Sequence, residues 1–210
     1  VTFLFLPAWI ERAKIAGLVG RDIHKQDRNE VAEMGGLPVA AGFIAGALAY
    51  IAFQALAYKN FEHVPHLFAA LTAILIATII GLVDDILGWK IGLRQMMKVL
   101  LTAAISLPII VLNAGNSAMN LPLIGAIDFG LLYPLLIVPI IIIGSSNGFN
   151  MLAGYNGLEA GMGIIILSTL SFMAYRTGGY WIAMLGVCMV AALAAFLFFN
   201  IYPSKVFPGD

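Results

Sequence analysis

Long uncharged apolar runs separated by short polar stretches form the dominant pattern of this chain. A helix needs about 20 apolar residues to cross the hydrocarbon core of a bilayer, with a range of roughly 17–25. Six stretches meet or approach this length and are the predicted spans, namely Leu37–Tyr58, Leu67–Val83, Gln95–Leu112, Phe129–Ser145, Leu158–Tyr175 and Tyr180–Tyr202. A shorter apolar stretch over Val1–Val19 predicts a further, partial helix, which brings the expected total to about seven.

Proline and polar residues mark irregular points in these spans. Pro134 and Pro139 predict a kink in the fourth span, because each proline lacks a backbone N–H, and neighbouring helices must satisfy the freed carbonyl groups. The third span carries Lys98 in its first turn and Pro108 near its end. We therefore expect an all-α, polytopic transmembrane bundle in which the fourth span is kinked and the third is a weaker span.

The composition supports this fold class and excludes several others. Apolar residues make up 61% of the chain and charged residues 10%, against about 45–50% and about 25% in soluble domains. Disorder requires the opposite bias, and Cys188 as the sole cysteine excludes a disulfide scaffold. Eleven basic and eleven acidic residues cancel, which argues against a nucleic-acid partner. We interpret residues 1–210 as a single membrane-embedded domain and as a fragment that lacks the start of its first helix.

The basic residues are distributed unevenly between the two sides of the predicted bundle. The loops over residues 59–66, 113–128 and 176–179 carry only Lys59 and Arg176. The positive-inside rule makes the opposite side, formed by residues 20–36, 84–94, 146–157 and 203–210, cytoplasmic. With Lys98 counted from the first turn of the adjoining span, that side carries seven basic residues, namely Arg21, Lys25, Arg28, Lys90, Arg94, Lys98 and Lys205.

Candidate chemistry gathers on the same side. Asp84 and Asp85 directly follow an apolar run, and carboxylates at a membrane boundary are costly unless they are paired or bind a metal. A pair of carboxylates can also supply a general base, although a helix cap with a solvated acid is an alternative. Lys98 can serve as a point charge for phosphate oxygens or simply reach the membrane interface. Glu30 and Glu33 are expected as solvated loop charges, with a contact to sugar hydroxyls as the alternative.

An Asn- and Gly-rich loop is predicted over residues 146–157. Irregular backbone at membrane depth is tolerated where it lines a cavity, although a plain turn would explain the same residues. Asn147 and Asn150 are three residues apart and would face one way on a helical turn. Their amide oxygens are hard neutral ligands that suit Mg²⁺ together with a carboxylate and phosphates.

Five segments of the chain, in order, resemble the polyprenyl-phosphate N-acetylhexosamine-1-phosphate transferase superfamily, of the glycosyltransferase 4 type. The likeness is greatest to its eukaryotic and archaeal branch, the UDP-GlcNAc–dolichyl-phosphate GlcNAc-1-phosphotransferases. The matching segments are Gly20–Lys25 with Gly35-Gly36, Gly81–Asp85, Lys98 ahead of Thr102–Pro108, Asn147–Gly161 and Tyr202–Asp210.

This resemblance implies an integral, multi-pass membrane enzyme with its active site on the cytoplasmic face of the endoplasmic reticulum or of an archaeal or bacterial plasma membrane. Such enzymes transfer GlcNAc-1-phosphate from UDP-GlcNAc to a polyprenyl or dolichyl phosphate and release UMP. This is the first step of lipid-linked oligosaccharide synthesis for protein glycosylation. The implied cofactor is Mg²⁺, with Mn²⁺ as an alternative, and the implied partners are both substrates and membrane lipids. A homodimer is a further possible assembly. The resemblance further implies that C-terminal helices are missing from residues 1–210.

The resemblance also assigns roles to individual residues. Asn150 and Asp210 are the implied metal ligands, and Asn147 lies near the metal. Lys98 is implied to contact the pyrophosphate, and Asp84 and Asp85 are implied to lie near the lipid phosphate. The implied uracil-binding residues are Gly154, Asn156 and Phe207, the last offering a stacking face.

Three other functions stay open on the sequence. A bacterial-type transferase would move a MurNAc-peptide phosphate or a GlcNAc phosphate to undecaprenyl phosphate. An ion-coupled membrane transporter would use the boundary acids as an ion site, but it predicts inverted repeats that are not visible here. An intramembrane aspartyl protease would use Gly209-Asp210, but it needs a second Asp within a facing span, and Asp84 lies at the edge of a predicted loop.

Overall fold

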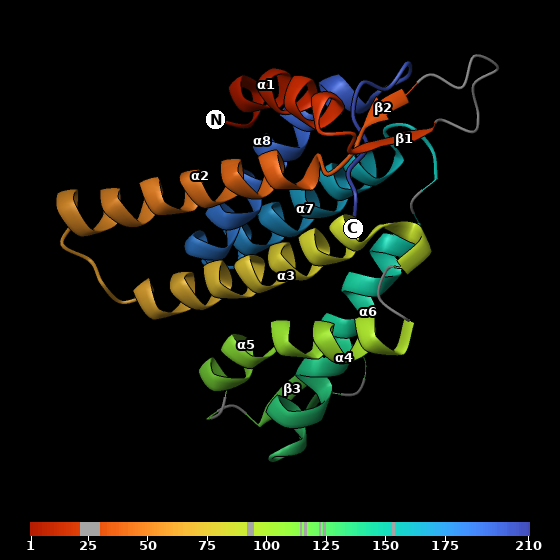
Figure 1. Cartoon of the computed structure of the whole chain (residues 1–210). Helices are drawn as coiled ribbons and strands as arrows, with labels where there is room; N and C mark the ends of the chain where they lie inside the picture. Colours follow the sequence, from red (N-terminus) through yellow and green to blue (C-terminus); the bar gives the residue numbers. More distant parts are fainter. Residues whose placement is uncertain are drawn as a thin grey trace.

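The computed structural model of the chain describes residues 1–21, 30–91, 95–113, 115, 117–121, 123, 125–152 and 154–210. Helices predominate among these residues (Figure 1). The helices are α1 (Thr2–Ile15), α2 (Gly36–Ala57), α3 (Val64–Ile91), α4 (Gln95–Ile105), α5 (Leu107–Leu112), the π-helical turn η1 (Tyr133–Ile137), α6 (Val138–Met151), α7 (Leu158–Arg176) and α8 (Tyr180–Asn200). The strands are β1 (Val19–Arg21), β2 (Glu30–Ala32), β3 (Ala118–Leu121) and β4 (Gly125–Asp128).

The helices confirm the predicted all-α, multi-pass architecture. Among the described residues, five helices are long and apolar enough to cross a membrane, and Met96–Leu112 forms a shorter apolar segment. Taking α4 with α5, and η1 with α6, as continuous units yields the seven helices expected from the sequence. Large apolar side chains such as Ile165, Leu170 and Phe172 are exposed on α7, as a bilayer-facing surface requires. The protein is an integral, multi-pass membrane protein.

Both helix interruptions lie beside prolines, and the one in the fourth span is the predicted kink. Helix α4 ends at Ile105, and α5 begins at Leu107 with Pro108 in its first turn. The π-helical turn η1 contains Pro134, and the chain becomes α-helical at Val138, beside Pro139. Because proline has no backbone N–H to donate to the preceding turn, the regular hydrogen-bond ladder breaks at each of these points.

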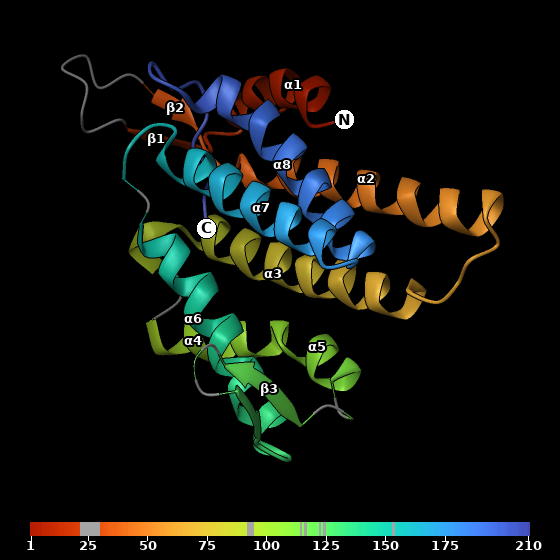
Figure 2. The same ribbon diagram turned by 180° about the vertical axis from the view of Figure 1, so that it is seen from behind.

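The long helices α2, α3, α7 and α8 lie side by side, and α4, α5 and α6 form a second group beside α3 (Figures 1 and 2). Phe43, Ala47 and Ile51 of α2 pack against Leu67 and Leu71 of α3. A second apolar cluster joins α1, β2, α2, α7 and α8 around Leu6, Phe196 and Val206. These two clusters hold the long helices together and bring the C-terminal segment against them.

Two stretches predicted as loops are wholly or partly helical. The prediction that residues 84–94 form a loop is wrong up to Ile91, because α3 continues through Asp84 and Asp85 to that residue. Residues 92–94 lie outside the described residues. Likewise α6 continues to Met151, so Asn147 and Asn150 lie on a helix. In both places the polar side chains find partners on other elements, and the helices therefore need not end where the apolar runs end.

Two short antiparallel hairpins were not predicted. Strand β1 pairs with β2, and β3 pairs with β4. Val206 forms a parallel bridge with Ala32 of β2, which attaches the C-terminal segment to the first hairpin. The α2–α3 connection and the α7–α8 turn lie toward one end of the long helices, and the β1–β2 hairpin and the C-terminus lie toward the other (Figure 1).

Candidate active site

Charged and amide side chains from three helices and the C-terminal segment meet beside α3. Lys98 of α4 forms ion pairs with Asp84 of α3 and, at 2.6 Å from its Nζ atom, with Oδ2 of Asp210. Asn150 of α6 donates a hydrogen bond from Nδ2 to the other carboxylate oxygen, Oδ1, of Asp210 at 2.9 Å. Asp210 is therefore held on both oxygens by groups from two different helices.

The two consecutive acids of α3 have different partners. Consecutive residues on a helix point about 100° apart, so Asp84 and Asp85 face different neighbours. Asp84 is only 7% exposed and pairs with Lys98. Asp85 accepts a hydrogen bond at Oδ1 from the backbone N–H of Asp210 at 3.0 Å. Asp84 thus fixes Lys98, and Asp85 fixes the backbone of Asp210.

Backbone hydrogen bonds hold the C-terminal segment against the start of α2. The N–H of Phe207 donates to the carbonyl of Ala32 at 2.8 Å, and the N–H groups of Gly35 and Gly36 donate to the carbonyls of Phe207 and Pro208 at 2.8 and 2.7 Å. The first N–H groups of a helix have no partner within it, so the segment satisfies donors that would otherwise be unpaired. A Cβ atom on Gly35 would lie 2.8 Å from the carbonyl oxygen of Phe207, which explains the need for glycine.

Glycine also allows Asp210 to lie directly against α3. A Cβ atom on Gly81 would lie 2.7 Å from the backbone carbonyl carbon of Asp210. Gly209 has a φ of 75°, a left-handed conformation in which glycine avoids the strain of a side chain. The Gly81–Asp85 and Gly209-Asp210 segments singled out in the sequence are therefore in direct contact.

A cavity of about 70 Å³ opens among these groups. Its polar lining comes from α3, α4, α6 and the C-terminal segment. A second cavity, of about 220 Å³ and mainly apolar, lies between α2, α3 and α8 and shares Gly81 and Asp210 with the first. The polar residues that line the smaller cavity are Asp84, Lys98, Thr102, Ser146, Asn147, Asn150 and Asp210.

Thr102 is a residue of this cavity that the sequence analysis did not assign to the site. Asn147 donates from Nδ2 to Thr102 Oγ1 at 3.0 Å and to the carbonyl of Ile143 at 2.9 Å. Thr102 in turn donates to the carbonyl of Lys98 at 2.9 Å. The spacing of one helical turn between Lys98 and Thr102 could have indicated that both face the same cavity.

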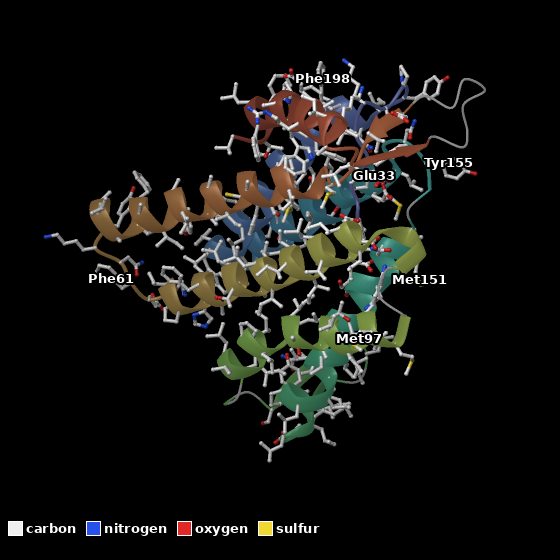
Figure 3. The ribbon with its side chains drawn as sticks, in the orientation of Figure 1. Glu33, Phe61, Met97, Met151, Tyr155 and Phe198 are labelled. Carbon is white, nitrogen blue, oxygen red and sulfur yellow. The ribbon has the colours of Figure 1, made fainter. Side chains whose placement is uncertain are left out.

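Two acids outside the spans, Asp210 and Glu33, have shifted pKa values. Burial acts to raise the pKa of Asp210, but hydrogen bonds from neighbouring side chains and the charge of Lys98 outweigh it and lower this pKa to about 2. Burial, followed by the negative charge of Asp210, raises the pKa of Glu33. The prediction of a solvated Glu33 is wrong: its side chain is half-buried and lies against Gly20, near the start of α2 (Figure 3). The pairing of β1 with β2 brings Glu33 against Gly20, and the sequence analysis did not predict these strands.

The donor set suits a hard divalent cation. Asp84 and Asp210 both pair with the ammonium group of Lys98, and Asp85 holds the backbone of Asp210 beside them. The described part of the chain contains no group of three His, Cys, Asp or Glu side chains arranged as a metal site. Mg²⁺, however, is commonly held by one or two carboxylates plus substrate phosphates. The oxygens present fit an ion of that kind.

The predicted uracil residues lie on two other segments. Gly154 and Asn156 are in the α6–α7 connection, where Tyr155 is exposed (Figure 3). Phe207 lies in the C-terminal segment, three residues before Asp210. Among the described residues, none of these three predicted residues lines the smaller cavity. Their assignment to the nucleotide stays a prediction.

Comparison with known proteins identifies relatives of the whole chain. A protein from Saccharolobus solfataricus named putative UDP-N-acetylglucosamine–dolichyl-phosphate N-acetylglucosaminephosphotransferase is 38% identical over 96% of the chain. A protein of the same name from Sulfolobus acidocaldarius is 32% identical over 100% of it. A phospho-N-acetylmuramoyl-pentapeptide-transferase from Latilactobacillus sakei is 27% identical, also over 100% of the chain.

These matches differ in how much of each relative they include. The chain spans 60% and 63% of the lengths of the two archaeal relatives and 67% of the bacterial one. The model of the family described as Glycosyl transferase family 4 matches residues 67–210. The matched region contains the three aspartates, the lysine and the two asparagines of the candidate site. Because the family model matches more than half of the chain, the chain belongs to Glycosyl transferase family 4.

Proposed function

We propose that the protein transfers GlcNAc-1-phosphate from UDP-GlcNAc to a polyprenyl or dolichyl phosphate at the cytoplasmic face of a membrane, releasing UMP. The observation that carries this proposal is the meeting of Asp84, Lys98, Asn150 and Asp210 at one cavity. Both substrates are anionic, so a site for them needs positive charge and cation-binding oxygens together. The names of the two archaeal relatives support the choice of sugar and lipid.

The reaction that fits this site is an in-line displacement at phosphorus. An oxygen of the lipid phosphate attacks the β-phosphorus of UDP-GlcNAc and forms a new P–O–P bond. The bond from the β-phosphorus to the oxygen bridging the two phosphates breaks, and that oxygen leaves with UMP. The lipid product carries a diphosphate linked to GlcNAc. Positioning and charge neutralisation contribute most of the catalysis in phosphoryl transfer.

The residues of the site divide this work. Lys98, fixed by Asp84 and Asp210, would place its ammonium group against the pyrophosphate oxygens. Asp84 and Asp85 would orient the attacking phosphate or accept its proton. Asp210 and Asn150 would hold Mg²⁺ or Mn²⁺, which supplies neutralising charge to the pyrophosphate when bound. In this arrangement the hydrogen bond from Asn150 to Asp210 leaves the Asn150 amide oxygen available as a ligand.

A second candidate is the bacterial-type reaction, with undecaprenyl phosphate as acceptor. Relatives named phospho-N-acetylmuramoyl-pentapeptide-transferase from Latilactobacillus sakei and probable undecaprenyl-phosphate N-acetylglucosaminyl 1-phosphate transferase from Bacillus subtilis match the whole chain at 27% and 28% identity. Offering UDP-GlcNAc and UDP-MurNAc-pentapeptide separately to the purified protein, each with dolichyl phosphate and with undecaprenyl phosphate, distinguishes the two. Turnover of either nucleotide with undecaprenyl phosphate alone would favour the second candidate.

The central test is metal-dependent UMP release by the complete membrane-embedded protein, supplied with UDP-GlcNAc and dolichyl phosphate. Asp210→Ala and Asn150→Ala should each abolish this release, because each removes an oxygen ligand from the proposed cation site. Asn120→Ala is the matched control, because Asn120 is exposed on strand β3, outside the cavity. Turnover close to that of the wild type in either site variant would refute the metal assignment.

A further inference from the structure

The last residue of α8, Asn200, connects two segments that are far apart in the sequence. Its side chain is 1% exposed. Its Oδ1 accepts a hydrogen bond from the backbone N–H of Gly157 at 2.9 Å, and its Nδ2 donates to the carbonyl of Val206 at 2.8 Å. Ser204, also buried, donates from its hydroxyl to the same carbonyl at 2.9 Å. A single amide thus satisfies one backbone group in each segment.

Only an amide of this size performs both tasks. An aliphatic side chain would leave the Gly157 N–H and the Val206 carbonyl without this buried partner, which is costly for each group. An aspartate would accept from Gly157, but its carboxylate has no proton to donate to Val206. The geometry at Gly157 is also demanding, because this residue is the N-cap of α7 and has a φ of 82°. Asn200 therefore fixes the point at which α7 begins.

The two segments joined in this way carry the residues predicted to bind the nucleotide. Gly157 ends the stretch that contains Gly154 and Asn156, and Val206 immediately precedes Phe207. Phe207 is held in turn by its hydrogen bond to Ala32, and Asp210 follows three residues later. A shift at Asn200 would therefore change the distance between the two predicted uracil-binding elements and would also disturb the segment leading to Asp210.

We propose that Asn200 is a positioning residue that holds the α6–α7 connection and the C-terminal segment in register, so that the uridine of the sugar nucleotide is bound between them. This inference rests on the proposed function for the identity of the nucleotide. The hydrogen bonds that join the two segments do not depend on it. Asn200 acts through the backbone groups of Gly157 and Val206, and its Nδ2 also lies 3.5 Å from the hydroxyl oxygen of Ser204.

The first experiment measures backbone hydrogen exchange in the complete protein in detergent. Asn200→Ala removes both contacts, so exchange should accelerate at least tenfold over residues 154–158 and over residues 204–208. Asn200→Asp keeps the acceptor for Gly157, so only residues 204–208 should accelerate. Asn120→Asp, on the exposed β3 strand, should change neither segment. Acceleration of a single segment in Asn200→Ala would overturn the proposal.

The second experiment separates positioning from a general structural role. Asn200→Ala should raise the KM for UDP-GlcNAc at least tenfold and leave the KM for dolichyl phosphate unchanged. Ser204→Ala, which keeps the contact from Asn200 to Val206, should cause a smaller rise. A lower maximal rate with both KM values unchanged would mean that Asn200 only supports folding, and would overturn the proposal.

Binding of UMP to the wild-type protein, measured by calorimetry, distinguishes failure of this inference from failure of the proposed function. If the wild-type protein binds UMP and Asn200→Ala binds it at least tenfold more weakly, both stand. If the wild-type protein binds UMP and the variant binds it equally well, the positioning role is refuted. If the wild-type protein neither binds UMP nor releases it from UDP-GlcNAc, the proposed function and the nucleotide role of Asn200 both fail, and hydrogen exchange alone decides whether the two segments are joined.

Discussion

The two halves of α3 bury different kinds of side chain. In the first half, Leu67 and Leu71 are 2% and 4% exposed and pack against the apolar side chains of α2. In the second half, Asp84 and Asp85 face Lys98 and the backbone of Asp210. Because both halves belong to one continuous helix, the apolar packing of the first half fixes the place at which the acids of the second half are presented.

This difference separates the part of α3 that holds the helices together from the part that contributes to the proposed active site. Association of helices in lipid depends on close packing rather than on the removal of apolar surface from water. The first half of α3 therefore requires close-fitting shapes. The second half requires particular charges and a bare backbone at Gly81, where the C-terminal segment makes contact. Substitutions in the two halves should accordingly have distinguishable effects.

The largest effect on activity is expected for Lys98→Gln, which removes charge from the polar half. Asp84, nearly buried, loses its cation, and so does Asp210. Loss of one preorganised charge at a reacting phosphate should lower the rate of UMP release by roughly 10²–10³-fold. The matched control is Lys59→Gln, because Lys59 is exposed in the α2–α3 connection. Equal rates in the two variants would mean that Lys98 serves only to anchor its helix.

A smaller loss is expected for Gly81→Ala, which adds one methyl group to the polar half. The new Cβ atom would lie 2.7 Å from the carbonyl carbon of Asp210, so the C-terminal segment must move away from α3. A displacement of this kind at a catalytic site costs about 10²-fold in rate. Gly144→Ala is the control, since Gly144 lies in α6 with open space around it. Wild-type turnover in Gly81→Ala would show that contact between α3 and Asp210 is not needed.

The smallest effect on activity is expected for Leu67→Ala in the apolar half. The lost packing should destabilise the protein by about 2 kcal/mol or more and lower its thermal unfolding temperature in detergent. The KM for UDP-GlcNAc should not change, because no site residue is touched. Leu75→Ala, which alters an exposed leucine of the same helix, should leave the unfolding temperature near that of the wild type. A raised KM without a thermal shift would contradict the division between the two halves.

The sequence predicted the spans well because length and hydropathy are local properties. The expected span Leu37–Tyr58 became α2 over Gly36–Ala57, and Leu158–Tyr175 became α7 over Leu158–Arg176. The same reasoning ended the second span at Val83, where the charges begin. The helix in fact continues to Ile91, because Lys98 and the Asp210 backbone give the two acids partners that no local pattern reveals.

Parts of the site were equally predictable, and parts were not. The spacing of Asn147 and Asn150 placed both on one helical face, and both line the same cavity. The role of Asn200 could not be predicted, because this residue ends an apolar helix and none of the residues three or four positions before it is polar. Its function depends on Gly157 and Val206, which approach it from loops that only the packing of α7, α8 and β2 brings together.

By itself, the sequence determined that the chain crosses a membrane several times, where its helices are interrupted, and which polar side chains lie near the ends of spans. These properties follow from the cost of placing charge and unpaired backbone groups in lipid. Only the tertiary structure decided that Asp210 contacts Lys98, Asn150 and Asp85, and that Asn200 joins two loops. The partners of Asp210 are 60 to 125 positions away from it in the sequence. Contacts over such separations form only when packing has brought the helices together.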